Sequence, residues 1–308
     1  MAERRRGKKI DGWLIVDKPA GITSATVVNR VRRATGAAKA GHGGTLDPLA
    51  TGILPLALGE ATKTVNYVVE GRKIYRFTVR WGEQRDTDDA EGQVTATSLL
   101  RPEPAEIEAV TGRFCGDIEQ VPPTYSAIKV AGERAYALAR ADRPVELPAR
   151  IVHVERMALI ECPDENHAIF EVEAGKGVYM RALARDLGIA LGCLGHVVAL
   201  RRLSVGPFTE ATAISLEKLE DVGHSAELQT YLLPVGSALA GIPALNLTEA
   251  EASSLQRGRP IAVLPVASRS PSSKVSKDAV VCAMARGRLV ALAQVKGGEI
   301  HPLRILNV

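Results

Sequence analysis

Residues 41–59 read GHGGTLDPLATGILPLALG, a glycine- and proline-rich loop that runs into an apolar segment. The carboxylate Asp47 directly precedes Pro48, so its backbone favours an extended conformation over a helical one. The glycines before it allow a tight turn and the close approach of another backbone or a ligand. An aspartate in such a loop usually bonds its own backbone. The segment alone therefore leaves two interpretations open, a turn-forming residue and a reacting carboxylate.

Composition places the chain among ordinary globular proteins. Its 308 residues suffice for one large domain or for two of unequal size. The net charge of +4 weakly favours an anionic partner such as nucleic acid. No apolar run is long enough for a transmembrane helix and the N-terminus lacks an apolar signal region, so we expect no membrane association.

Cysteine and histidine spacing gives no indication of a metal centre. The four cysteines lie far apart without a CxxC pair, and the six histidines form no HxxxH or HExxH pair. Neither a disulfide framework nor a zinc site is indicated, and we expect no metal and no cofactor. A reducing, cytoplasmic setting fits this pattern.

The first part of the chain alternates short strands and helices. Residues 1–11 are basic and predict a solvated tail, with phosphate contact as the alternative. Residues 12–19 predict a buried strand, and a helix capped by Thr23 or Ser24 should follow. Another helix is predicted from residue 60 to the glycine at position 71.

The segment IYRFTVRW at residues 74–81 predicts a strand because polar and apolar residues alternate. Tyr75 is then either the first member of a core stripe or a ring at the rim of a pocket. The loop after it, residues 82–92, carries four clustered acids at positions 86, 88, 89 and 91. It lacks the placement of ligands in a calcium loop, so we expect a solvated loop.

The middle of the chain predicts an insertion between regular elements. A helix is expected at residues 104–111, and residues 116–150 predict a basic inserted subdomain with a hairpin at 131–132 and a short helix. Residues 151–160 and 167–174 predict two strands of a β-hairpin. The helix that follows should carry Arg181 and Arg185 on one flank, one turn apart.

Residues 241–308 predict a separate small unit. A helix is expected at residues 248–258, followed by the short β-runs IAVLPV, AVVCAMA and RLVALAQV, and a serine-rich loop is expected at 267–278. Many short strands with tight turns predict a small β-barrel.

Four blocks together carry a resemblance to a known family. They are LIVDKPAGITS, GHGGTLDPLATGILPLALGEATK, KIYRF and GKGVYMRALARDLG, and in this order they resemble the TruB family of tRNA pseudouridine synthases. The resemblance implies an α/β (α+β) fold with a mixed central β-sheet flanked by helices over residues 12–240. Residues 241–308 resemble the PUA-type RNA-binding domain more loosely. Two positions depart from the family: Gly43 stands where the family often has a larger small residue such as threonine, and Val178 stands where threonine is usual before Tyr179.

The resemblance also implies an activity and a set of site residues. The family isomerises uridine to pseudouridine at position 55 in the TΨC loop of tRNA, without a cofactor. By the resemblance, Asp47 is the catalytic carboxylate, Arg181 is the arginine that pairs with it in a bidentate contact and keeps it ionised, and Tyr75 stacks on the base. Tyr179 and Leu200 match the pocket wall.

Two further residues are assigned by the resemblance alone. His42 matches the residue that occupies the space left by the extruded base, although an imidazole that braces the loop is the alternative. Lys18 matches a pocket-side lysine, with a solvated surface lysine as the alternative. The insertion at 116–150 resembles a flexible element that closes over the TΨC stem-loop. We expect tRNA as the partner of a monomer that requires no guide RNA and no protein partner.

Two other functions fit the sequence less well. A nucleotide-binding enzyme fails because GHGGTL does not complete GxGxxG and no P-loop lysine follows. A non-catalytic RNA-binding or tRNA-folding protein with a synthase-like core would be expected to lack Asp47, Tyr75 or Arg181, and all three are present.

Overall fold

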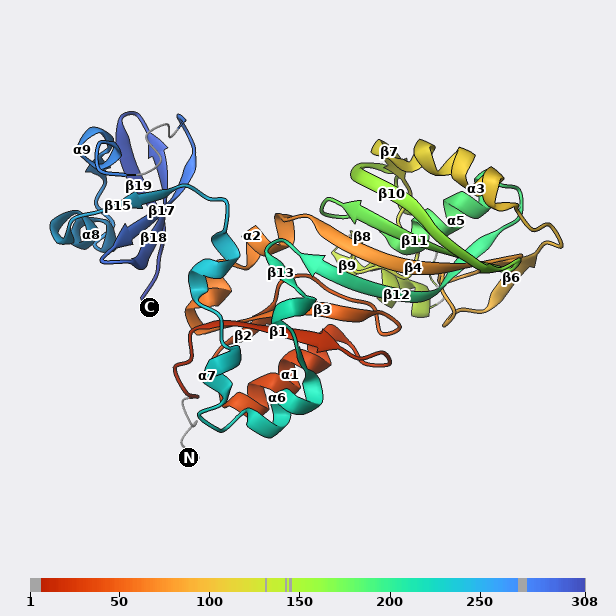
Figure 1. The fold of residues 1–308 in the computed structure, drawn as a ribbon, viewed down its shortest axis with the longest axis horizontal. Helices are drawn as coiled ribbons and strands as arrows, with labels where there is room; N and C mark the ends of the chain where they lie inside the picture. The colour runs from red at the N-terminus through yellow and green to blue at the C-terminus, as the bar shows by residue number, and fades with distance from the viewer. Residues whose placement is uncertain (1–6, 131, 142, 144–145, 271–275, 308) are drawn as a thin grey trace.

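A computed structural model describes residues 7–130, 132–141, 143, 146–270 and 276–307 (Figure 1). Its largest element is a ten-stranded mixed sheet flanked by helices, as the sequence predicts. The strands follow the order β14 (Ile214–Ser215), β1 (Gly12–Lys18), β3 (Thr51–Leu58), β12 (Gly195–Val205), β4 (Lys73–Trp81), β11 (His167–Ala174), β10 (Arg150–Asp164) and β7 (Gly116–Gln120), with β2 (Ala40–His42) paired to β3 and β13 (Phe208–Thr209) paired to β12.

The sheet consists of two halves that meet at a short parallel pairing. On one side β1 pairs with β3 over seven residues, and on the other β12 runs antiparallel to β4 along most of its length. Between them, β3 and β12 pair only at Arg201↔Thr51 and Arg202↔Gly52. Gly52 has φ +99°, and a Cβ there would lie 2.2 Å from the carbonyl oxygen of Arg202. Only glycine allows the two halves to approach so closely.

Helices cover both halves of the sheet. The half that contains β1 packs against α1 (Ser24–Thr35) and α6 (Leu216–Val222), and the half that contains β4 packs against α5 (Met180–Ala190) and α3 (Pro104–Thr111). Thr23 caps α1 as predicted, since its side chain accepts from Thr26 N. The short helix α7 (Leu228–Tyr231) also packs on this half, with Leu228 in the core cluster of β1. Within the described residues, none of the helices has the length and apolar character needed to cross a membrane.

The helix predicted from residue 60 to 71 is interrupted. A 3₁₀ turn, η1 (Gly59–Lys63), precedes α2 (Val65–Glu70). The break falls at Thr64, whose backbone N and Oγ1 both donate to the carbonyl oxygen of Ala61. A threonine that bonds a nearby carbonyl competes with the regular helical ladder, which accounts for the interruption.

The prediction of a solvated acidic loop at 82–92 holds for Asp86 and Glu91, which are exposed, and is wrong for Asp88 and Asp89. The strands β5 (Glu83–Arg85) and β6 (Val94–Thr97) pair, and the turn between them buries Asp88 and Asp89. Asp88 Oδ2 lies 2.9 Å from Arg185 Nη1 on α5, and burial raises the pKa of Asp88 to about 6. The counter-charge that permits this burial comes from a helix about a hundred residues away, so the local sequence does not reveal it.

The expected insertion also differs from its predicted limits. Its first five residues form β7, which pairs with β10 and so belongs to the main sheet. The rest contains the predicted hairpin, β8 (Lys129–Val130) and β9 (Glu133–Arg134), and the predicted short helix α4 (Ala135–Arg140). Residues 131, 142 and 144–145 lie outside the described part.

A five-stranded sheet forms the C-terminal unit. It curls into a half-barrel consistent with the predicted PUA-like fold, in the order β15 (Ala244–Asn246), β17 (Val280–Ala285), β18 (Arg288–Lys296), β19 (Glu299–Ile305) and β16 (Ile261–Ala262). The helix α8 (Glu249–Gln256) begins at a capping box of Thr248 and Glu251. The predicted strand IAVLPV is wrong beyond its first two residues, because Val263–Ala267 form the helix α9. Pro265 has no N–H for a strand ladder but is tolerated in the first helical turn. Residues 271–275 of the serine-rich loop lie outside the described part.

The end of the chain fastens the C-terminal unit to the main sheet. Leu306 is 1% exposed and belongs to an apolar cluster that also contains Trp13 of β1. Asn307 N donates to Glu60 Oε2 at 2.7 Å, and Lys9 Nζ donates to Asn307 O at 3.0 Å. Residues 7–9 are exposed, as the prediction of a solvated tail requires, but Lys8, Lys9 and Asp11 all form hydrogen bonds to other segments, so this part of the tail is anchored. Residues 1–6 lie outside the described part.

Replacing Leu306 with serine should weaken this attachment. We expect the free energy of unfolding to fall by about 2–4 kcal/mol, because a buried leucine side chain is lost and a cavity remains. The matched control is Leu303→Ser on β19, the strand that ends directly before Leu306, where the leucine is 39% exposed. Urea denaturation of both variants measures the difference, and equal losses would show that Leu306 does not hold the two units together.

Candidate active site

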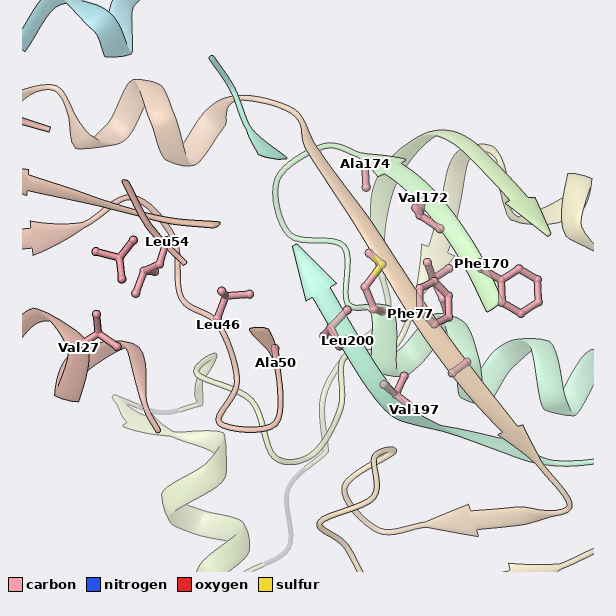
Figure 2. Close-up of a cluster of buried hydrophobic side chains, with 14 of the residues drawn as sticks. Val27, Leu46, Ala50, Leu54, Phe77, Phe170, Val172, Ala174, Val197 and Leu200 are labelled. Atoms are coloured by element: carbon pink, nitrogen blue, oxygen red, sulfur yellow. The ribbon is translucent and has the colours of Figure 1, made fainter. Parts of the chain in front are cut away.

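A cavity of about 240 Å³ opens where the two halves of the sheet meet. It lies beside the start of β3, where the loop that carries Asp47 runs between α1 and β12; Figure 2 shows Leu46 and Ala50 on this loop and Leu200 on β12. The cavity is lined by Gly44, Thr45, Leu46, Asp47, Val69, Lys73, Tyr75, Ser126, Ala127, Gly175, Lys176, Gly177, Val178, Tyr179, Met180, Arg181, Leu200 and Arg202.

Asp47 stands between two apolar anchors. Leu46 and Ala50 are buried in the main core, whereas the Asp47 side chain is about one-third exposed, at 34%. Ala50 N donates to Asp47 O at 3.1 Å, so the loop also forms the turn that its proline and glycines predict. The carboxylate therefore faces the cavity from a loop whose flanks are fixed by burial.

Arg181 reaches Asp47 from the first turn of α5. Its Nε lies 3.0 Å from Asp47 Oδ2, in an ion pair without hydrogen-bond geometry. The other two nitrogens donate to the backbone, Nη1 to Thr87 O at 2.8 Å and Nη2 to Tyr125 O at 2.9 Å. The expected bidentate contact with Asp47 is thus not formed. The fork of the guanidinium is occupied by carbonyls of the acidic loop and of the insertion, which hold it beside the carboxylate.

Tyr75, Tyr179 and Leu200 line the same cavity from three different elements. Tyr75 is half-buried on β4, at the pocket rim that the sequence left as one of two possibilities. Tyr179 is fixed by Gln120 at the end of β7, because Tyr179 N donates to Gln120 Oε1 at 2.9 Å and Gln120 Nε2 donates to Tyr179 O at 3.2 Å. Gln120 was not predicted as a site residue. The one sequence signal for it is its position at the end of a strand, two residues before the proline pair at 122–123.

His42 and Lys18 are not among the residues that line the cavity. His42 lies on β2 opposite Leu56, and burial together with the charge of Arg202 lowers its pKa.

Lys18 is 0% exposed and donates to the carbonyl oxygens of Pro19, Ile22 and Pro48 at 2.9, 2.7 and 3.2 Å. The alternative of a solvated surface lysine is therefore wrong. Burial lowers the pKa of Lys18 to about 8, while nearby Asp47 opposes this shift.

Two buried cations of the cavity were not predicted. Arg202 of β12 and Lys73 of β4 both line it and are almost fully buried. Burial lowers the pKa of Lys73 to about 8, and Arg202 contributes in the same direction. Arg202 stands two residues after Leu200, so strand alternation already placed it on the same face as a predicted wall residue.

These residues give the cavity a distinct chemistry. It combines one carboxylate, a buried arginine in contact with it, aromatic side chains and further positive charge. Within the described residues, no group of three or more histidine, cysteine, aspartate or glutamate side chains gathers as a metal site. The arrangement places a partly exposed carboxylate beside a buried arginine and aromatic side chains, a set of groups that suits a nucleophile or a base acting on a bound ligand.

Solved structures with this fold define the class. One titled "Crystal Structure of a Cbf5-Nop10-Gar1 Complex" aligns with a TM-score of 0.74 and 25% identity, covering 96% of this chain and 84% of that chain. Another, titled "Structure of H/ACA RNP bound to a substrate RNA containing 2'-deoxyuridine", aligns with a TM-score of 0.73 and 23% identity, covering 96% and 85%. The fold is that of the pseudouridine synthases.

Sequence comparison then gives the family. Residues 32–180 match the model of the TruB family pseudouridylate synthase N-terminal domain, and residues 181–240 match the tRNA pseudouridylate synthase B C-terminal domain. A protein of Rhodospirillum rubrum named tRNA pseudouridine synthase B is 56% identical over the full length of both chains, and one of Caulobacter sp. with the same name is 50% identical over the full length of both. The chain belongs to the TruB family and is a pseudouridine synthase, an isomerase.

The buried lysines predict a pH dependence of stability. The pKa of Lys18 and of Lys73 is about 8 in the folded chain against an ordinary value of 10.5. Above pH 8 the unfolded chain keeps protons on these lysines that the folded chain has lost, so the free energy of unfolding should rise with pH. Lys73→Met should make this rise smaller, because one of the two groups is removed, whereas Lys39→Met, at an exposed position, should not.

Urea denaturation between pH 7.5 and 9 measures this effect. The range ends there because burial raises the pKa of Cys193 and Cys282 from 9.0 to about 11, which gives the opposite slope at higher pH. A rise of equal size in Lys73→Met and in the parent chain would show that Lys73 does not titrate in this range.

Proposed function

We propose that this protein converts uridine 55 in the TΨC loop of tRNA into pseudouridine, with Asp47 as the catalytic carboxylate. The observation that carries the proposal is the cavity itself. Asp47 is the one carboxylate among the described residues that line it, and the buried Arg181 lies 3.0 Å away. The curated relatives bear the name tRNA pseudouridine synthase B, which supports tRNA as the substrate.

The reaction requires few groups. The N1–C1′ bond breaks with its electron pair on the uracil, the detached base rotates, and C5 bonds to C1′. The proton on C5 then leaves and N1 ends with a proton, so atoms and electrons balance without a donor or an oxidant. Asp47 acts at the ribose, either by attack on C1′ or as a base; both routes require the ionised carboxylate. Arg181 would stabilise that negative charge by direct attraction, since its Nε lies 3.0 Å from Asp47 Oδ2.

The remaining residues would hold the base. A cavity of about 240 Å³ is smaller than the roughly 300–1,000 Å³ typical of drug-sized ligands, which suits one extruded nucleotide. Tyr75 would stack on the uracil and is a candidate to remove the C5 proton, while Tyr179 and Leu200 would form the wall. His42 would fill the space that the base leaves in the RNA loop. Lys18 would support the loop that carries Asp47 through its hydrogen bond to the carbonyl oxygen of Pro48.

The rest of the chain would hold the RNA. The insertion already contributes Ser126 and Ala127 to the cavity wall, and its Tyr125 carbonyl binds Arg181, which supports closure over the TΨC stem-loop. Exposed arginines of the C-terminal unit would contact phosphates, which position RNA without reading its sequence. These are Arg257, Arg259, Arg286, Arg288 and Arg304. The protein would act as a monomer in the cytoplasm, without a guide RNA or an obligatory protein partner.

Mapping pseudouridine in treated tRNA tests the proposed position. Purified protein should convert position 55 of an unmodified tRNA transcript, because the TΨC loop presents that base for extrusion. A transcript with cytidine at position 55 is the control and should contain no new pseudouridine. Conversion at any other uridine of this control would disprove the assignment of the site.

Replacing Asp47 with asparagine tests its role. The substitution preserves size and loop shape but removes the negative charge, so pseudouridine formation should stop while tRNA binding persists. Product formation by tritium release and tRNA affinity by filter binding measure the two properties separately. Turnover above trace level in Asp47→Asn would exclude Asp47 as the catalytic carboxylate. The same pair of measurements separates an isomerase from a tRNA-binding protein that lacks catalysis.

A further inference from the structure

Arg202 has an unusual set of partners for a buried arginine. Its side chain is 1% exposed, and within the described residues no carboxylate forms an ion pair with it. Each of its three side-chain nitrogens donates to a backbone carbonyl: Nε to Ile53 O at 2.7 Å, Nη2 to Gly44 O at 3.0 Å and Nη1 to Thr45 O at 3.3 Å. Two of these carbonyls belong to the loop that presents Asp47.

The other side of that loop is also fixed. Ser24 Oγ accepts from Leu46 N at 2.8 Å and donates to Leu46 O at 3.0 Å, and Lys18 Nζ donates to Pro48 O. Gly44, Thr45, Leu46 and Pro48 are therefore all bonded to groups outside the loop. Asp47 is the residue in the middle of these attachments.

The loop needs support of this kind. Gly44 has φ +124°, a conformation that residues other than glycine rarely adopt, and a Cβ there would lie 3.4 Å from Arg202 Nη1. A glycine-rich segment is not held in one shape by its own backbone preferences. A guanidinium is rigid and planar, so it can fix several carbonyls at once, which a flexible ammonium group cannot do. Burying a charge without an ion-pair partner is costly, so the hydrogen bonds from Arg202 to the three carbonyls are needed to offset that cost.

We propose that Arg202 is a positioning residue for the isomerisation, which holds Gly44 and Thr45 so that Asp47 meets the ribose of the bound uridine. The inference rests on the proposed role of Asp47. Reacting groups must be held to within about 0.5 Å, and an error of about 1 Å costs on the order of a hundredfold in rate. Arg202 would therefore affect the rate of the chemical step and leave RNA affinity unchanged.

The neighbouring arginine provides a matched control. Arg201 precedes Arg202 on the same strand but pairs with Asp17 and Glu210 on the other face, outside the cavity. In single-turnover assays with saturating tRNA, Arg202→Gln should react roughly 30- to 100-fold more slowly than the parent chain. Its dissociation constant for tRNA should be unchanged. Arg201→Gln should react within about twofold of the parent rate, since a surface pair contributes little.

Arg202→Lys separates geometry from charge. It keeps the positive charge and loses the planar fork, so we expect a rate about tenfold below that of the parent chain. A parent-like rate in Arg202→Lys or Arg202→Gln would overturn the proposal. A weaker tRNA affinity with an unchanged rate at saturation would also overturn it, because Arg202 would then be a substrate-binding residue.

Hydrogen exchange tests the clamp without relying on activity. Amides of residues 43–50 should exchange faster in Arg202→Gln than in the parent chain, while those of β4 stay protected. If Arg202→Gln does not fold, Arg202→Lys serves for the same comparison. An unchanged exchange rate at 43–50 would refute the clamp. Failure of the parent chain to modify tRNA would instead refute the proposed function, and the exchange result would still decide whether Arg202 holds the loop.

Discussion

The contact between Asp47 and Arg181 is the interaction on which the site depends. It joins the two halves of the sheet, since Asp47 stands at the start of β3 and Arg181 in the first turn of α5, which packs on β12. The arginine also binds carbonyls of the acidic loop and of the insertion. One buried guanidinium therefore brings four segments together around the carboxylate, and the loss of any of them would change where the charge lies.

Three more buried cations lie in the wall of the cavity or beside it. Lys18, Lys73 and Arg202 are buried there and bond chiefly to backbone carbonyls. Such groups are costly to bury, but their carbonyl partners reduce that cost and leave the net charge in place. Two of them bind the loop that carries Asp47 directly. Lys73 and Arg202 also line the cavity, where their charge would stabilise an anionic leaving base under the proposed function.

The C-terminal unit is attached through its last residues. Ile305 and Asn307 bond to Lys63 and Glu60 of η1, the turn that directly follows β3. Because β3 directly follows the loop of Asp47, the unit proposed to bind RNA is fastened to the strand that supports the proposed catalytic residue. These bonds add to the apolar cluster of Trp13 and Leu306 and to the bond from Lys9 to Asn307 O, which together fasten the C-terminal unit to the main sheet.

Local pattern determined much of the fold from the sequence alone. Alternation predicted β4, with Phe77, Val79 and Trp81 buried in the core, and capping signals placed the start of α1 and the ends of α3. The motif blocks identified the family, and the resemblance to it named Asp47, Tyr75, Tyr179, Arg181 and Leu200, which line one cavity. These predictions succeed because periodicity, capping and motif spacing act over a few neighbouring residues.

Only the tertiary structure decided which charges are buried and what they bind. The acidic loop looked solvated because the arginines that pair with it, on α5, lie far along the chain. Nothing in the sequence indicates that the two Nη atoms of Arg181 donate to the carbonyls of Thr87 and Tyr125. The same is true of the hydrogen bond by which Arg202 holds the loop of Asp47. Every residue has a backbone carbonyl, so the residue type does not show which carbonyl a distant side chain will bind. Partners of this kind are decided only when distant segments come together in space.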